Sequence, residues 1–425
     1  MSDPPRPRGS APSLDAATWL RIGLLSFGGP AGQIALMQRM LVDERRWVEP
    51  APFLAALNFC MLLPGPEAQQ LATWIGWHRA GWRGALVAGS LFVLPGALVM
   101  LALSAAYVAW GRVPLVEAAF LGVKCAVVAI VVEALVRVAR RALVFRGAAA
   151  LALLAFVAIF ALDVPYPLVV VAALLVGSLS ARDAGGGTHV GAQRPSGLRA
   201  GTIAAFAWLV PTALLVHGLG ADHVLARVAT FYSELAVTTF GGAYAVLGYV
   251  ADRAVDDYGW LSVAQMADGL GLAETTPGPL ILVLEFVAFL AGHEAGGAGL
   301  AVVASLVALW ALFAPSFLWI LLAAPHVERL NANPRLRGAM RGVTAAVVGV
   351  IASLSLWFAW HVLFGRVGRI DIAGLSMPWP DASSFDARTI APLAAAFVLL
   401  FAAKRGIVTT LAACALLGVA TSYAR

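Results

Sequence analysis

The sequence predicts an all-α polytopic membrane protein with about 13 transmembrane helices, in two homologous, inverted repeats that contain broken helices. Three observations support this fold class. Hydrophobic residues make up 61% of the chain and charged residues only 12%, about half the charged share of an average soluble domain. The apolar residues form runs close to the length of a bilayer span, about 20 residues. A pattern of glycines and prolines in the first half of the chain recurs in the second half.

The apolar runs follow a polar N-terminal tail, residues 1–14. Spanning helices satisfy every backbone polar group internally, so repeated long runs favour a helical bundle. The first and eighth runs contain Gly-Gly breaks and could instead re-enter the membrane from one side. The 13 expected spans are residues 15–40, 51–76, 84–110, 114–136, 147–162, 164–181, 200–217, 223–250, 260–292, 297–324, 336–364, 389–403 and 406–423.

Composition and cysteine spacing exclude several other classes. Cys60, Cys125 and Cys414 lie inside apolar runs without metal-ligand spacing, so we expect core cysteines, no metal site and no cofactor. The net charge is +6, but the basic residues lie mostly between apolar runs, so we expect no nucleic-acid partner. The polar N-terminus lacks a short apolar core with a cleavage site, so no cleavable signal peptide is expected.

The basic residues also predict the orientation in the membrane. If the N-terminus is cytoplasmic, most of them fall in cytoplasmic segments, as the positive-inside effect requires. We therefore expect a multi-pass protein of a bacterial inner (plasma) membrane, with a cytoplasmic N-terminus and a periplasmic C-terminus. The cluster of Arg39, Arg45 and Arg46 opposes this orientation, because it would then lie outside.

An internal repeat is the strongest signal in the sequence. Phe27-Gly28-Gly29 recurs as Phe240-Gly241-Gly242, and Pro64-Gly65-Pro66 recurs as Pro277-Gly278-Pro279, both at a shift of 213 residues. Farther along each repeat the shift becomes 220, which small insertions explain; it pairs Pro95 with Pro315, Pro114 with Pro334, and Gly122-Val123 with Gly342-Val343. Chance does not readily hold one register across several separate features.

The repeat divides the chain into an N-terminal copy, residues 15–181, and a C-terminal copy, residues 223–425. Between them lies a linker with one extra span, residues 182–222, whose Gly-rich part 182–199 is a plausible hinge. An odd number of spans separates equivalent positions, which predicts inverted copies, a common architecture of secondary transporters. An even count would give parallel repeats instead.

Each copy has two breaks at matching places, one at Phe-Gly-Gly and one at Pro-Gly-Pro. Paired glycines weaken a helix, proline removes a backbone donor, and Pro30 can open a new helix at its first turn. A helix that restarts inside the membrane presents unpaired N–H groups and partial positive charge, which suit an anion. The breaks therefore predict an anion site at the midplane, between the repeats. The alternative is that these residues only kink helices for close packing.

Polar side chains beside the breaks complete the candidate site. Glu67 and Glu274 are candidates for carrying protons, because carboxyl groups withdrawn from water hold a proton more readily. The alternative for each glutamate is a helix cap or a headgroup contact. The other candidates for substrate binding, beside the Phe-Gly-Gly and Pro-Gly-Pro segments, are Pro30, Gln33, Gln69, Gln70, Tyr244, Thr275 and Thr276.

Lys124 lies within an apolar run and is a candidate counter-charge for an oxyanion. The equivalent residue of the second repeat is Thr344. The alternatives for Lys124 are an ion pair with Glu117 or Glu133, or snorkelling to an interface.

The strings around the breaks resemble the chromate ion transporter family. The segment from Phe27 to Met37 and the segment from Leu63 to Ala72 resemble its N-terminal half, and residues 240–244 and 274–280 resemble its C-terminal half. Both halves are present, so the resemblance is to the long-chain, two-domain form. It implies chromate export from the cytoplasm, with sulfate as a chemical mimic, driven by ion gradients and not by ATP. Gln33 departs from the pattern, because many relatives have His there.

The sequence thus predicts a secondary transporter and not an enzyme. The expected activity is proton-coupled export of chromate, or of sulfate or a related tetrahedral oxyanion, by rocking around a site between the repeats. The alternative is a passive anion channel. A membrane-embedded enzyme is disfavoured, because the chain has no HExxH motif, Walker-type loop or nucleophile with a base nearby. The expected partners are the oxyanion, protons and the lipid bilayer, and a homodimer is one possible assembly.

Overall fold

The computed structural model describes residues 14–27, 29–180, 198–240, 242–324, 327, 333–372 and 375–423. The tail 1–13, Gly28, Gly241 and most of the expected hinge 182–199 lie outside these residues.

The first repeat contains α1 (Ala16–Leu25), α2 (Gly29–Met37), η1 (Gln38–Glu44), α3 (Pro50–Cys60), α4 (Glu67–Trp110), α5 (Pro114–Ala142), α6 (Ala148–Phe160) and α7 (Tyr166–Ser180). Next follow α8 (Leu198–Leu219), α9 (Val224–Thr238), α10 (Ala243–Ala251), η2 (Asp252–Asp257), α11 (Val263–Thr275), η3 (Leu280–Leu282), α12 (Val283–Ala323), α14 (Pro334–Leu363), α15 (Ile390–Phe397), η7 (Val398–Ala402) and α16 (Ile407–Tyr423).

The helix starts follow from local sequence. Proline occupies the first turn of α3, α5 and α14, where its missing N–H would have no intrahelical acceptor. Ser262 and Gln265 form a capping box at α11, and the Asn333 side chain accepts hydrogen bonds from the first turn of α14. Pro114 and Pro334 are equivalent in the repeat, so the same signal starts the same helix twice.

Five helical segments of the described chain are long and apolar enough to cross a membrane: Glu67–Trp110, Pro114–Ala142, Arg199–Leu219, Leu280–Ala323 and Pro334–Leu363. Four of the expected spans, 15–40, 51–76, 223–250 and 260–292, each consist of two helices separated by a break. The ten-residue α1 rises only about 15 Å, half the thickness of a hydrocarbon core. These segments are therefore broken helices, as their Gly and Pro patterns predict.

The long helices α4 and α12 each reverse direction at a glycine. Backbone angles leave the helical region at Ala80 and Gly81 in α4, and at Gly296 and Gly297 in α12. Gly76 lies against Gly84, and Gly292 lies against Leu300, contacts that a straight helix could not make. Each reversal falls where the sequence predicts a short link between two spans, so the spans 84–110 and 297–324 are the second arms of helical hairpins.

The second half of each repeat packs on the other repeat. The helices α6 and α7 of the first repeat pack on α14 of the second, whereas α15 and α16 pack on α5 of the first. Gly122 of α5 touches Gly418 of α16, and the equivalent Gly342 of α14 touches Gly177 of α7. Small residues let membrane helices approach closely. The matched contacts show that the repeats interlock about a pseudo-two-fold axis and do not form separate bodies.

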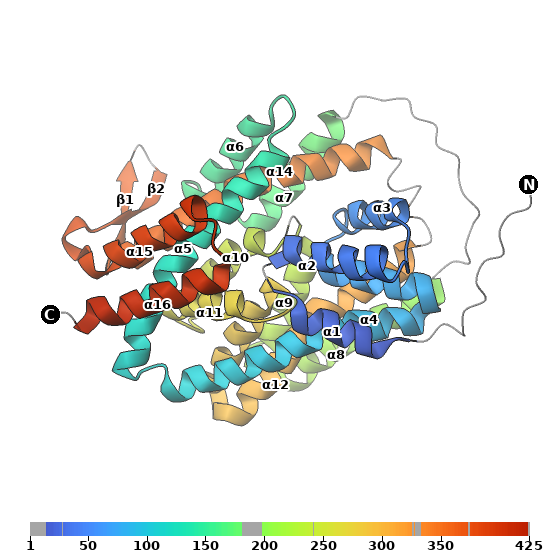
Figure 1. The fold of residues 1–425 in the computed structure, drawn as a ribbon, viewed down its shortest axis with the longest axis horizontal. Coiled ribbons are helices and arrows are strands. Elements are labelled where there is room, and N and C mark those ends of the chain that lie inside the picture. The colour runs from blue at the N-terminus through green and yellow to red at the C-terminus, as the bar shows by residue number, and fades with distance from the viewer. Residues whose placement is uncertain are drawn as a thin grey trace, which may run out of the picture.

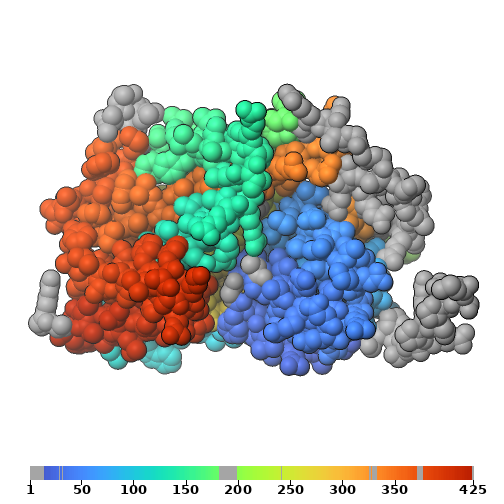
Figure 2. Space-filling view, turned by 45° about the horizontal axis from the view of Figure 1, so that its top comes forward, coloured from blue at the N-terminus to red at the C-terminus, as the bar shows by residue number. Residues whose placement is uncertain are grey.

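The first helices of the chain and the last helices lie at opposite ends of the long axis of the molecule. In Figure 1, α1 to α3 lie in blue on the right and α15 and α16 in red on the left. Figure 2 shows the blue and red segments separated by the teal segment near α5. The first arm of α12 lies in the core, and every residue from Val283 to Gly292 is buried.

A two-stranded antiparallel sheet is the element that the sequence does not predict. It consists of β1 (Val367–Ile372) and β2 (Leu375–Pro380) and lies between α14 and α15. Arg369 of β1 forms an ion pair with Asp163, which precedes α7. The hairpin therefore ties the C-terminal repeat to the link between α6 and α7 of the N-terminal repeat.

Candidate functional site

The four breaks meet through two reciprocal backbone hydrogen bonds. The Gly65 N–H donates to the Thr239 carbonyl at 2.8 Å, and the Gly278 N–H donates to the Ser26 carbonyl at 2.7 Å. Gly65 and Gly278 are equivalent in the repeat, as are Ser26 and Thr239. Each Pro-Gly-Pro break is thus held by the Phe-Gly-Gly break of the other repeat, and the pseudo-two-fold axis passes between them.

Glycine is required at the centre of each Pro-Gly-Pro break. Gly65 has a φ of 115° and Gly278 a φ of 95°, a region that residues with a Cβ rarely adopt. Space is also tight, since a Cβ on Gly65 would lie 3.1 Å from Ser316 Oγ and one on Gly278 would lie 3.4 Å from Gly96 Cα. Ser316 and Gly96 are equivalent in the repeat. The second arm of α12 therefore packs against the first Pro-Gly-Pro break, and the second arm of α4 packs against the second one.

A small cavity of about 20 Å³ lies where four helical segments begin. A helix N-terminus presents N–H groups that have no acceptor within the helix, and it carries about half a positive charge. The starts of α2, α4, α10 and η3 all border this cavity. Its lining residues are Pro30, Gln33, Pro66, Glu67, Ala68, Gly242, Ala243, Pro279, Leu280 and Ile281.

Gln33 and Glu67 are the polar side chains on this cavity. Gln33 is fully buried, its Nε2 donates to the Gly278 carbonyl at 2.6 Å, and its Oε1 has no hydrogen-bond partner among the described residues. Gln33 therefore ties α2 to the opposite break and leaves one acceptor free. Glu67 begins α4, where the helix dipole stabilises a negative charge.

Gln69 and Gln70 follow the first Pro-Gly-Pro but do not line the small cavity. Gln70 Nε2 donates to the Pro64 carbonyl at 2.6 Å and so braces the loop between α3 and α4. Gln69 is fully buried, and neither atom of its side-chain amide has a hydrogen-bond partner among the described residues. It borders an apolar cavity of about 1,070 Å³ between α4, α8 and α12. Gln70 therefore supports the break, whereas Gln69 faces the apolar cavity.

The residues around the second Pro-Gly-Pro have a different arrangement. The Tyr244 hydroxyl donates to the buried Glu274 at 2.5 Å, and this pair lies outside the small cavity. Thr275 and Thr276 donate their hydroxyl protons to the Leu272 carbonyl within α11. The two glutamates are therefore not equivalent, since only Glu67 borders the helix starts.

Other predicted residues shape the breaks through their backbone. Phe27 is half-exposed, and the Phe240 carbonyl accepts a hydrogen bond from Tyr166 at 3.4 Å. Gly29 and Gly242 adopt positive φ at the starts of α2 and α10. The Pro277 carbonyl lies against Gly96. Gly28 and Gly241, the middle residues of both Phe-Gly-Gly segments, are not among the described residues.

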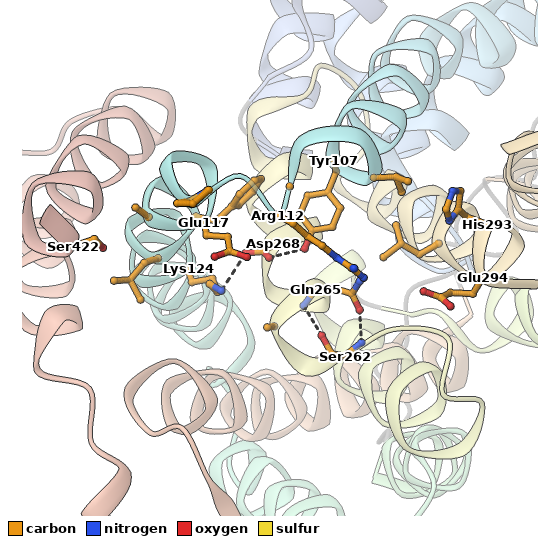
Figure 3. A pocket seen from close by; sticks show the side chains of 18 of the residues that line it. Tyr107, Arg112, Glu117, Lys124, Ser262, Gln265, Asp268, His293, Glu294 and Ser422 are labelled. Carbon is orange, nitrogen blue, oxygen red and sulfur yellow. Dashed lines mark hydrogen bonds and ion pairs between the residues drawn. The ribbon is translucent and has the colours of Figure 1, made fainter. Parts of the chain in front are cut away.

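Lys124 lies apart from the breaks. It borders an open polar cavity of about 820 Å³ that shares no lining residue with the small cavity. Its Nζ lies 3.5 Å from Asp268 Oδ1, and the Tyr107 hydroxyl donates to Asp268 Oδ2 at 2.8 Å. In Figure 3, Lys124 and Tyr107 approach Asp268 from two sides. The expected partner Glu117 or Glu133 is wrong: the pairing residue is Asp268, and Glu133 instead pairs with Arg137 at 2.7 Å.

The sequence reasoning missed two buried carboxylates and one hydroxyl. Asp268 and Glu285 lie in buried parts of α11 and α12, and Glu285 Oε2 has no hydrogen-bond partner in the described chain. Ser316 Oγ is likewise buried and unbonded beside Gly65. An ionisable residue within an apolar run is itself a signal of function, and it would have singled out Asp268 and Glu285. Within the described residues, no group of three His, Cys, Asp or Glu side chains is placed to hold a metal.

Comparison with known proteins gives one consistent family. The family described as "Chromate transporter" matches residues 16–178 and 226–419. The chromate transport protein of Pseudomonas aeruginosa is 34% identical over 371 residues, covering 85% of this chain and 84% of that protein. A probable chromate transport protein of Synechococcus elongatus is 31% identical, covering 79% and 81%. The chromate transport protein of Cupriavidus metallidurans is 30% identical, covering 78% and 79%. No solved structure matches the chain.

Proposed function

The chain belongs to the chromate transporter family, and we propose that it is a secondary transporter that exports chromate, and with it sulfate or a related tetrahedral oxyanion, across the inner membrane. The family membership makes it a multi-pass membrane transporter and not an enzyme. The proposal adds the binding place, the link to protons and the direction of transport.

The observation that carries the proposal is the convergence of four helix starts on one cavity. Each helix N-terminus is equivalent to roughly half a positive charge, so four together offer about two positive charges. Chromate and sulfate each carry two negative charges. Backbone N–H groups can bind the oxygens of either ion, because both are tetrahedral and similar in size. Selection between them should therefore be modest, and sulfate should compete.

The cavity also indicates that transport needs a conformational change. A volume of about 20 Å³ holds about one water molecule, whereas the oxyanion carries four oxygens. The helix starts must separate to admit the ion. Two bundles could move relative to each other: α1, α4, α8, α9 and α12 pack in one, and α5, α6, α7, α14, α15 and α16 in the other. Each bundle contains elements of both repeats, so the rocking units are these bundles.

Proton coupling follows from the position of Glu67. An ionised Glu67 on the cavity wall would repel a dianion and occupy the same helix starts. Protonation of Glu67 therefore favours oxyanion binding, and the two events are linked reciprocally. Glu274, bonded to Tyr244 outside the cavity, is the second proton-carrying candidate.

Everted membrane vesicles provide the test. Vesicles that contain the protein should accumulate chromate against its gradient, sulfate should compete, and an imposed pH gradient should change the rate. Glu67→Gln and Glu274→Gln should each alter the pH dependence, whereas Glu49→Gln, an exposed control, should not. Accumulation that never exceeds the outside concentration would identify a passive channel, and unchanged pH profiles in both variants would disprove the proton role.

A further inference from the structure

The open polar cavity around Lys124 contains a buried ionic network that the central site does not use. Asp268 of α11 is 6% exposed, pairs with Lys124 of α5 and accepts a hydrogen bond from Tyr107 of α4. Asp268 Oδ2 is bonded to Tyr107, whereas Oδ1 has no hydrogen-bond donor within the described structure. The carboxylate thus has one oxygen held by Tyr107 and one that faces the Lys124 ammonium group alone among the described residues.

Only one of the two repeat-related positions carries this network. The residues equivalent to Tyr107, Asp268 and Lys124 in the other repeat are Val327, Ala55 and Thr344, in the register set by Pro114 and Pro334 and by the Pro-Gly-Pro breaks. The equivalent positions therefore carry none of the three polar groups. A buried ion pair rarely stabilises a fold, because desolvation offsets the attraction between its charges. A network that appears in only one copy therefore suggests a function.

We propose that this cavity is a second oxyanion site, an access site at which Lys124 exchanges the Asp268 carboxylate for a tetrahedral dianion when Asp268 takes up a proton. This inference rests on the proposed function, since it assumes that the protein handles oxyanions. A proton from water in the cavity adds to Asp268 Oδ1. The carboxylic acid keeps its hydrogen bond from Tyr107 and no longer neutralises Lys124. The ammonium group of Lys124 is then free to bind the dianion.

The other charges that border the cavity leave this exchange in place. They are Arg112 of α4, Glu117 of α5, His293 and Glu294 of α12, and Arg388. The Arg388 guanidinium donates one hydrogen bond to each carboxylate oxygen of Asp386, at 2.9 and 2.7 Å, so Arg388 is not free to replace Lys124. Glu117 is exposed at the rim, where water screens its charge. Lys124 is the cation that meets a buried carboxylate, so its availability depends on that carboxylate.

The position of the network also fits an access site. Asp268 lies seven residues before the end of α11, a rise of about 10 Å, and the second Pro-Gly-Pro follows directly. An ion bound beside Asp268 and Lys124 is therefore staged about two helical turns before the second Pro-Gly-Pro, in an open cavity.

The test counts sulfate ions bound to the purified full-length protein with Glu67→Gln, by equilibrium dialysis at acidic and at alkaline pH; this background removes the titration of the central site, and the variants below are made in it. Sulfate is suitable because it stays a dianion over this range. We expect about two ions per chain at acidic pH and about one at alkaline pH. Asp268→Asn should bind two at both, and Lys124→Met should lose the second ion, with its affinity about tenfold to hundredfold weaker.

Controls separate folding and central-site effects from the exchange. The double variant Lys124→Thr, Asp268→Ala copies the residues of the other repeat and leaves no unpaired buried charge; it should stay folded and bind one ion at both pH values. Glu49→Gln removes an exposed charge that does not border this cavity and should leave the ion counts unchanged. One ion at both pH values in the Glu67→Gln background, or a pH-dependent second ion when Asp268→Asn is added to it, overturns the access site. Absence of all oxyanion binding and transport instead overturns the proposed function.

Discussion

The packing of α4 against the second Pro-Gly-Pro break predicts that Gly96→Ala damages both stability and transport. A Cβ on Gly96 would lie 2.1 Å from the Pro277 carbonyl oxygen and 2.6 Å from Leu282 Cδ1. The first contact is to backbone, so the break or α4 must shift by about an ångström. Such overpacking costs about 1–3 kcal/mol. The shift also strains the hydrogen bonds that Gly278 makes with Ser26 and Gln33, each with a net value of about 0.5–1.5 kcal/mol.

These costs sum to about 2–6 kcal/mol, and the higher helix propensity of Ala offsets about 1 kcal/mol. The matched control is Gly299→Ala in α12, which has no atom within 4 Å of the added Cβ and should gain up to about 1 kcal/mol. The apparent Tm in detergent and the initial rate of chromate uptake by everted vesicles measure the effect. We expect a lower Tm and at least about tenfold slower transport for Gly96→Ala. Equal behaviour of the two variants would refute the close contact between α4 and the break.

Three further predictions follow from other parts of the structure. Gln33→Leu removes the donor to the Gly278 carbonyl and should destabilise the protein by about 1–3 kcal/mol, seen as a lower Tm; an unchanged Tm would contradict the cross-repeat bond. Reporters fused to the two termini should lie on opposite sides of the membrane if the number of crossings is odd, whereas reporters on the same side would favour parallel repeats. The Ser383 hydroxyl and N–H donate to Asp381 and hold the pKa of its carboxyl below its usual range. The contribution of this turn is therefore present at neutral pH and is lost as pH falls through the lowered pKa. The protection of the amides at 381–384, measured by hydrogen exchange relative to the intrinsic rate at each pH, should fall in acid, and Asp381→Asn should remove that dependence.

The sequence predicts the fold class and the location of the breaks because both depend on local chemistry. Apolar composition, Pro at helix starts and Gly-Gly or Pro-Gly-Pro interruptions act within a few residues. Repetition then adds a register, which pairs Gly65 with Gly278 before any contact between them is known. The broken spans 15–40 and 223–250 follow from the same signals.

Long-range pairing is what the sequence could not supply. No sequence feature around Lys124 indicates that it pairs with Asp268, which lies on a helix of the other repeat. Glu117 and Glu133 are closer in sequence and were therefore the expected partners. The exchange of α6 and α7 for α15 and α16 is likewise a property of packing, because each of these apolar helices could cover several surfaces. The hairpin of β1 and β2 was missed because its short strands follow a long apolar helix without a clear alternating pattern.

The central claim is that an oxyanion binds where the starts of α2, α4, α10 and η3 converge. A structure of the protein with tungstate, a tetrahedral oxyanion that scatters strongly, tests it most directly. We predict a tungstate ion within hydrogen-bond distance of backbone N–H groups at the starts of α4 and η3, with Gln33 and Glu67 beside it and the small cavity enlarged. Tungstate bound only elsewhere, with the four helix starts still closed around a space for one water molecule, would contradict the account.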